Sequence, residues 1–518
     1  MTVMIGNFRD PAAKGRAMAH ASRSGGGTTL ARGAIGLREV LFQSVTSMAP
    51  AGAVALSIAA GATYAGGALP LAVLLALIAC LLVASSIGQL AKHLPSAGSV
   101  YTYPAEAIHP AIGFLVGWGY ALVEALIGPL TTVIFGYLVA SVLNSEANWP
   151  LTTTWVCFMI GATIAIALLN YRGVQVSARA GTILGAFEIL VFLALAIWLI
   201  AKAGSGNTLS VFSLHFATIK GYKGFSGIAA GSIYTVLAFI GFEASAPLAE
   251  EASNPRRTIP RAVLISCLAI GVFYVITTYA GDVYFGPHRY VAFGALGGGS
   301  PWIQLGRDVW GVGWVLVFLA IVNSTFANGN AGTLAATRTW FAMARVGVLP
   351  RPLATLHPKW RSPYVGVMVQ AVITLAVGLP LGIHFGPTEA FIFLATILTG
   401  VMISIYIVFN LSCICYYLRR ARSEFNILLH LIIPVLGILA FIPAWFTALG
   451  LGGSFLKFVV PLSYPVSETG LAIGIWYVLG IVVLVTLYVR HPERLPEMRR
   501  VFADEPVGTP GEPVTEGA

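Results

Sequence analysis

The segment MAPAG (residues 48–52) interrupts the first long apolar stretch of this chain, and FIGFE (residues 239–243), followed by Pro247, interrupts the sixth. Proline removes a backbone donor and clashes with the preceding helical turn. Glycine adds backbone freedom. Lipid offers no hydrogen bonds, so freed backbone groups are tolerated only where they line protein or a cavity. The two segments therefore predict two broken helices that face the interior.

Composition places these interruptions in a membrane. The 518 residues are 57% hydrophobic and 10% charged, whereas a soluble domain has roughly a quarter charged residues. Apolar runs of about 20 residues, the length that crosses a bilayer, recur along the chain. Strands are not expected, because these runs are too long and too continuously apolar for barrel strands. The sequence predicts an all-α integral membrane protein with twelve transmembrane helices, near residues 41–64, 68–91, 111–141, 152–170, 180–201, 227–248, 261–285, 309–343, 364–382, 388–418, 427–449 and 469–489.

The distribution of positive charge predicts the topology. Of the 30 Lys and Arg residues, 24 fall in segments on the N-terminal side of the predicted membrane. Positive residues concentrate in cytoplasmic loops, so both termini are expected in the cytoplasm. The net charge of +10 is thus a topology signal, and no nucleic-acid partner is expected. The predicted organisation is a flexible basic tail (1–35), a transmembrane domain (36–492) and a disordered tail (493–518).

The sequence favours neither a cofactor nor a metal. The five cysteines lack metal-ligand spacing, and none of the nine histidines lies in the middle of a predicted span. A glycine-rich phosphate loop with Lys and Ser or Thr is also missing from the sequence. ATP-driven transport within this chain is therefore not expected, and the clustered side chains of a membrane enzyme are not found.

The two predicted breaks carry opposite partial charges. A half-helix that begins near Ala53 points its positive N-terminal end at the bilayer centre, which suits a carboxylate. The helix that ends at Phe239 presents carbonyls, which suit an ammonium group. A zwitterionic amino acid has the matching charges, and Phe239 or Phe242 is a candidate gate over it. The alternatives are a packing kink for the first break and lipid-facing positions for the two phenylalanines.

Three carboxylic acids, Glu124, Glu188 and Glu243, lie inside predicted spans and away from the span ends. A carboxylate at the bilayer centre costs at least about 2.5–3.5 kcal/mol, so such residues face the interior. Burial favours the protonated form of a carboxyl group, which makes proton exchange plausible. We take Glu243, beside the second break, as the first candidate for proton coupling and Glu188 as the second. Glu124 is interpreted as a structural hydrogen-bonding residue, and this alternative also applies to the other two.

Ser324 and Thr325 are adjacent hydroxyl residues in the eighth span. They are candidate ligands for a sodium ion against carbonyls freed in the first span. The alternative, which we favour, is that each hydroxyl bonds to its own helix, as Ser and Thr often do in membranes.

Four segments resemble the amino acid–polyamine–organocation (APC) permeases. They are residues 94–101 (LPSAGSVY) with 117–120 (GWGY), residues 170–174 (NYRGV), residues 239–260, and residues 338–350. The resemblance implies a five-plus-five inverted repeat with discontinuous helices 1 and 6, and two additional helices. It also implies a substrate held by the unwound parts of those two helices. The residues it assigns to substrate binding are Ala49, Pro50, Ala51, Gly52, Ala53, Phe239, Ile240, Gly241 and Phe242.

This chain departs from the family pattern at two places. Many relatives read Gly-Ser-Gly in the first span, whereas residues 49–52 here contain no hydroxyl. Some proton-coupled relatives carry a lysine in the fifth span, where this chain offers Glu188. An amine-based coupling mechanism is therefore not supported by the sequence.

The expected function is secondary active transport of an amino acid or related amine across the cytoplasmic membrane by alternating access. Protons are the expected coupling ion, with sodium as the alternative. A polyamine or organocation transporter, an amino acid exchanger and, more distantly, a channel remain open alternatives. The substrate's identity, the direction of transport and the oligomeric state are not determined by the sequence.

Overall fold

The computed structural model describes residues 35–96, 98–173, 178–295, 300–451, 456 and 459–496. Most of both predicted tails therefore lies outside the described residues. Apolar residues dominate the described chain and nearly all of it is helical, because a helix satisfies its own backbone in lipid. The helices are α2 (Leu37–Met48), α3 (Pro50–Gly52), α4 (Ala59–Ala65), α5 (Leu69–His93), α6 (Ser99–Ala107), α7 (Pro110–Ala147), α8 (Leu151–Tyr171), α9 (Ala178–Ala203), α10 (Phe225–Phe239), α11 (Pro255–Phe285), α12 (Val291–Ala295), α13 (Pro301–Trp310), α14 (Trp314–Arg345), α15 (Tyr364–Phe385), α16 (Pro387–Arg419), α17 (Ile433–Ala448) and α18 (Thr469–Arg490).

Tighter and wider helical turns connect these elements. Two π-helical turns precede α4 and α17, and a nine-residue 3-10 stretch, Phe242–Glu250, follows α10. The π turns are Ala53–Ile58 and Leu428–Ile432, and the other 3-10 turns are Gly66–Ala68, Gly204–Gly206, Leu209–Phe212, Leu214–Phe216, Pro287–Arg289, Gly311–Gly313, Arg351–Ala354, Arg422–Glu424, Val466–Glu468 and Pro492–Arg494.

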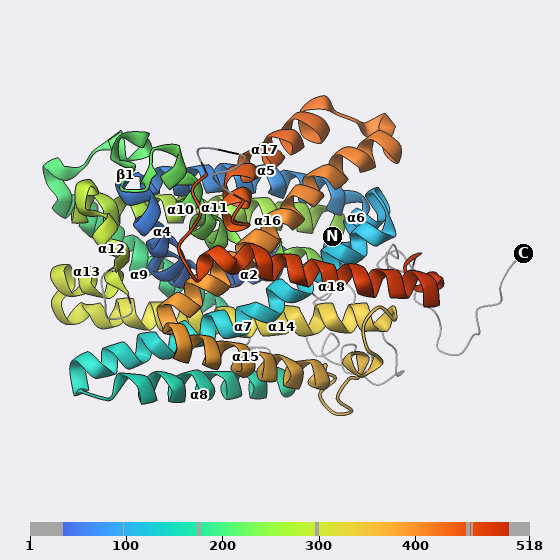
Figure 1. The fold of residues 1–518 in the computed structure, drawn as a ribbon, viewed down its shortest axis with the longest axis horizontal. Helices are drawn as coiled ribbons and strands as arrows, with labels where there is room; N and C mark the ends of the chain where they lie inside the picture. Colours follow the sequence, from blue (N-terminus) through green and yellow to red (C-terminus); the bar gives the residue numbers. More distant parts are fainter. Residues whose placement is uncertain are drawn as a thin grey trace, which may run out of the picture.

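A small β-hairpin qualifies the prediction that strands are absent. Strands β1 (Thr218–Ile219) and β2 (Tyr222–Lys223) pair antiparallel, with Thr218 opposite Lys223. The hairpin belongs to the connection between α9 and α10. It lies with α12 and α13 at one end of the bundle, on the left in Figure 1. The spans themselves are helical, as predicted.

Eleven segments of the described residues are long and apolar enough to cross a membrane. One of them, Leu37–His93, has 57 residues, whereas a span needs about 20. Its helix is interrupted at Gly66–Ala68, where Gly66 has a φ of 57°. Glycine adopts this left-handed conformation without the steric cost of a Cβ.

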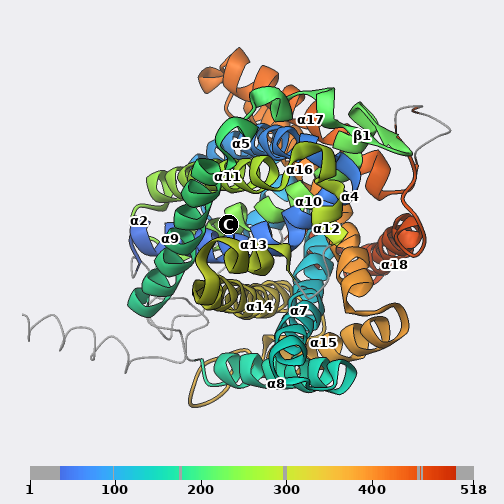
Figure 2. The same ribbon diagram turned by 90° about the vertical axis from the view of Figure 1, so that its left-hand side faces the viewer.

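The helices form an inner group and an outer group. The apolar cores of α7, α10 and α16 are largely buried, whereas α18 is mostly exposed. Figure 2, which looks along the bundle, shows α8, α9, α15 and α18 around the outside. Large apolar side chains such as Leu190, Val372 and Val478 are more than half exposed on this outer group. Such a surface fits contact with lipid.

Both predicted breaks are present. Helix α2 ends at Met48, Ala49 adopts a left-handed conformation with a φ of 47°, and Pro50 begins α3. The break is shorter than the predicted segment 49–53, because only Ala49 leaves the helical path. Proline suits the first helical position, where its fixed φ fits and no amide hydrogen is required. The second half-helix therefore begins at Pro50 and not near Ala53.

The second break follows α10. Ile240 has an extended backbone and Gly241 has a φ of 119°, after which the chain continues as the 3-10 stretch. A Cβ built on Gly241 would lie 2.7 Å from the carbonyl carbon of Ser47. The two broken helices therefore touch at their breaks, and glycine is required there both by the backbone angle and by this close approach.

Candidate functional site

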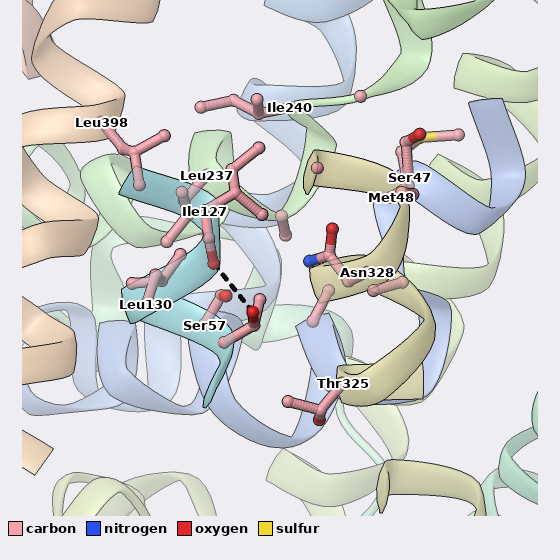
Figure 3. Close-up of a pocket in the computed structure, with 18 of the residues that line it drawn as sticks. Ser47, Met48, Ser57, Ile127, Leu130, Leu237, Ile240, Thr325, Asn328 and Leu398 are labelled. Atoms are coloured by element: carbon pink, nitrogen blue, oxygen red, sulfur yellow. Dashed lines mark hydrogen bonds between the residues drawn. The ribbon is translucent and has the colours of Figure 1, made fainter. Parts of the chain in front are cut away.

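A cavity of about 60 Å³ lies between the two breaks. Segments from α2, α3, α7, α10, α14 and α16 enclose it, and Figure 3 shows side chains from several of them around the same space. Its lining residues are Ser47, Met48, Ala49, Gly52, Ala53, Leu56, Ser57, Glu124, Ile127, Leu130, Thr131, Ile134, Leu237, Ala238, Ile240, Gly241, Ala244, Thr325, Asn328, Ala331, Gly332, Ala335, Phe391 and Leu398.

The cavity contains part of the predicted site. The predicted residues that line it are Ala49, Gly52, Ala53, Ile240, Gly241 and Thr325. The predicted residues that do not line it are Pro50, Ala51, Phe239, Phe242, Glu243, Glu188 and Ser324. The broken backbone thus borders the cavity as expected, whereas most of the predicted side chains lie behind it.

Neither predicted gate reaches the cavity. Phe239 and Phe242 are both fully buried. The Phe239 ring packs edge-on against Tyr274, with 5.2 Å between ring centroids, and Phe242 packs against Tyr406 at 5.5 Å. The gate prediction is wrong for this conformation, and so is the alternative of a lipid-facing position. Helix rotation, which the sequence does not specify, directs both rings into the core.

Tyr274 joins the two breaks. Its hydroxyl oxygen lies 2.7 Å from the carbonyl oxygen of Met48 and 2.9 Å from that of Ala238, so the two carbonyls share its one donor hydrogen. These carbonyls lie at the ends of α2 and α10, where the helices leave backbone acceptors unsatisfied. Two of the carbonyls that were expected to bind an ammonium group or sodium therefore share one donor from the protein.

Glu243 does not line the cavity, and its contacts stabilise the second break. Its carboxylate accepts from the amide of Gly241, with the nitrogen 3.3 and 3.2 Å from the two oxygens. The hydroxyl of Tyr406 donates to Oε2 at 3.0 Å. Ser44 donates to the neighbouring Phe242 carbonyl at 2.8 Å. These hydrogen bonds agree with the alternative given above for Glu243, in which its role is structural.

Glu188 belongs to α9, and its carboxylate lies beside the start of the second half-helix, α3. Asn323 donates to its Oε1, and the Ser324 hydroxyl and the Ala51 amide are further polar neighbours of the carboxylate. Glu188 is 3% exposed. The helix N-terminus that was expected to attract a substrate carboxylate therefore faces a carboxylate of the protein itself.

The two hydroxyl residues of α14 differ in their partners. A Cβ built on Gly52 would lie 3.4 Å from both the Ser324 Oγ and the Thr325 Oγ1, so both lie against the first break. Thr325 donates to the carbonyl of Ile321, one turn earlier, at 2.7 Å. The prediction that the Thr325 hydroxyl bonds to its own helix is thus confirmed. The Ser324 hydroxyl instead faces Glu188.

Glu124 was underestimated by sequence reasoning. It lies on α7, is 5% exposed and lines the cavity, with the hydroxyl of Tyr120 beside it. Its Oε2 has no hydrogen-bond partner among the described residues. The sequence did contain evidence for such a role, since a carboxylate inside a membrane span faces the protein interior and is a candidate functional residue. Asn328 on α14 was missed altogether, and its amide points into the space bounded by Ser57 and Ile127 in Figure 3.

Comparison with known proteins places this architecture in a family. The sequence is 29% identical over 342 residues to the low-affinity putrescine importer PlaP of Escherichia coli K12, covering 63% of this chain and 72% of the relative. It is 27% identical over 362 residues to the branched-chain amino acid permease BcaP of Bacillus subtilis 168, covering 65% and 74%. It is 28% identical over 351 residues to the uncharacterized transporter Rv1999c of Mycobacterium tuberculosis, covering 66% and 73%. A family model described as amino acid permease matches residues 39–497. The chain therefore belongs to the amino acid permease family, whose members are membrane transporters and not enzymes.

Proposed function

We propose that this permease moves an amino acid or related amine across the cytoplasmic membrane as a secondary active transporter with alternating access. The observation that carries the proposal is the cavity that forms where two broken helices touch. Paired discontinuous helices around a site near the bilayer centre are characteristic of secondary transporters. The names of the relatives, which include a putrescine importer and a branched-chain amino acid permease, agree with a small amino compound as substrate.

The proposed topology has twelve spans with both termini in the cytoplasm. Division of Leu37–His93 at Gly66–Ala68 turns eleven apolar segments into twelve. The first break lies in span 1 and the second in span 6, so five spans separate equivalent positions. An odd offset inverts one half relative to the other, which supports a five-plus-five inverted repeat with two further helices. The transmembrane domain would cover residues 36–492, with the two tails on the cytoplasmic side.

Uptake into proteoliposomes tests the proposed function. The purified protein is reconstituted, and labelled amino acids and amines are offered with and without sodium and with and without a proton gradient. Saturable accumulation against a substrate gradient is the expected result, because a channel cannot concentrate its substrate. Equilibration without accumulation under every gradient would favour the channel alternative.

Proton coupling through Glu243 is part of the proposal, with Glu188 as the second candidate and sodium near Ser324 and Thr325 as the alternative. Glu243→Gln keeps the shape of the side chain and removes its titration. Since an amide stays neutral, we expect uptake by the variant to lose most of its dependence on pH. The measurement is initial uptake rate from mildly acidic to mildly alkaline pH.

Glu468→Gln is the matched control for this experiment, because Glu468 is exposed at the start of α18. It should keep the pH profile of the unmodified protein. If Glu243→Gln keeps that profile as well, Glu243 has only the structural role described above, and the same test then passes to Glu188.

A further inference from the structure

The cavity between the breaks has a single ionisable side chain. Among its lining residues, which all belong to the described part of the chain, Glu124 is the one acid, and neither Lys, Arg nor His is present. The remaining polar lining side chains are neutral: Ser47, Ser57, Thr131, Thr325 and Asn328. The site therefore offers negative charge to a solute and no positive side chain.

Several of the charged and dipolar groups around the cavity have contacts within the protein. The single hydroxyl hydrogen of Tyr274 is shared between the carbonyls of Met48 and Ala238, near the ends of α2 and α10. Glu243 accepts from Gly241 and Tyr406. Glu188 faces the start of α3 and accepts from Asn323. The Oε2 atoms of Glu124 and Glu188 both lack a partner among the described residues, but of these two acids only Glu124 lines the cavity.

A carboxylate-bearing solute fits this arrangement poorly. Its carboxylate would enter a buried site that has no basic side chain and is lined by the acid Glu124, and an unpaired buried charge is costly. An ammonium group has the opposite sign to Glu124, and a charge-assisted hydrogen bond to a carboxylate is among the strongest available. Repulsion between Glu124 and a solute carboxylate would therefore discriminate against amino acids, and repulsion of this kind is a common source of selectivity between similar solutes.

We propose that Glu124 binds the ammonium group of the transported solute, and that this solute is an aliphatic amine without a carboxylate group. The proposal rests on the proposed transport function and narrows its substrate class. The carbon chain of the amine would lie against Ile127, Leu130 and Leu237. Thr131 donates its own hydroxyl hydrogen to the Ile127 carbonyl at 2.8 Å, so its oxygen remains free to accept from a second amino group.

A pair of ligands with the same carbon chain tests this without any mutation. Putrescine and 4-aminobutyrate each carry an ammonium group, but a carboxylate in the second replaces an ammonium group in the first. Calorimetric titration of the purified full-length protein should show putrescine binding at least about 30-fold more tightly, as expected for the cost of an unpaired buried charge. n-Butylamine should bind, and leucine should not compete. Equal or tighter binding of 4-aminobutyrate or leucine would overturn the proposal.

Variants then assign the interaction to Glu124. Glu124→Gln should weaken putrescine binding by about 30-fold or more, and Glu124→Asp, which keeps the charge, should lose less. The control is again Glu468→Gln, and gel filtration and melting curves check folding of each variant. If Glu124→Gln is unstable, Glu124→Asp and the ligand pair still decide the outcome. Unchanged putrescine affinity in Glu124→Gln would remove Glu124 from the site.

Transport separates this proposal from the function on which it rests. Saturable uptake of leucine that survives Glu124→Gln would leave the transporter function intact and contradict the amine-binding role. Failure of the reconstituted protein to accumulate either amines or amino acids would instead contradict the proposed function.

Discussion

Gly241→Leu is expected to abolish accumulation of substrate in proteoliposomes. Gly241 has a φ of 119°, which side chains with a Cβ rarely adopt, and forcing such a residue there costs on the order of 1–3 kcal/mol. A Cβ at this position would also lie 2.7 Å from the carbonyl carbon of Ser47 and 2.9 Å from its oxygen. These are backbone atoms, so they cannot move aside as a flexible side chain can. The substitution therefore pushes the two breaks apart or fills the cavity.

The measurements are substrate binding and uptake by the purified variant. Gly161→Leu is the control, because Gly161 is exposed on α8 and a Cβ there would meet no atom within 4 Å. It should transport as the unmodified protein does. Normal affinity and uptake in Gly241→Leu would show that the substrate site lies away from the two breaks.

Tyr274→Phe is expected to destabilise the protein and to reduce transport several-fold. The substitution keeps the buried ring that packs on Phe239 and removes the hydroxyl whose one hydrogen is shared between the carbonyls of Met48 and Ala238. A buried carbonyl that loses its donor costs roughly 1–3 kcal/mol. Because both carbonyls belong to the broken helix ends, we expect the lost hydrogen bond to disturb the geometry of the candidate site.

Thermal unfolding in detergent and initial uptake rates measure this effect. Tyr279→Phe on the same helix is the control, since its hydroxyl bonds to Asn207, away from the breaks, at 3.2 Å. A melting temperature that falls equally in both variants would contradict a special role of Tyr274. Unchanged transport in Tyr274→Phe would show that the breaks do not depend on this hydroxyl.

The positions of the breaks could be predicted because their causes are local. Proline at position 50 cannot continue the hydrogen-bond pattern of α2, and glycine at position 241 permits a backbone angle that other residues avoid. The apolar composition likewise predicts helical spans, since lipid leaves the backbone few alternatives. The length of the first break was overestimated, because Pro50 starts a new half-helix at once.

The sequence also identified three of the buried acids, but it did not single out the fully buried Asp282 and did not show which acid faces the cavity. The cost of a carboxylate in lipid depends only on its position in a span, so Glu124, Glu188 and Glu243 could all be named. Which of them faces the cavity depends on the rotation of α7, α9 and the segment after α10. Glu124, which was interpreted as structural, is the one that lines the cavity.

The sequence by itself determined that the chain is a helical membrane protein with two interrupted helices and buried acids, because these follow from composition, proline, glycine and the properties of lipid. Only the tertiary structure decided how the interrupted ends are satisfied. Tyr274 lies 226 residues from Met48, and Tyr406 lies 163 residues from Glu243. Contacts over such separations arise from the packing of whole helices, and no local pattern of residues encodes them.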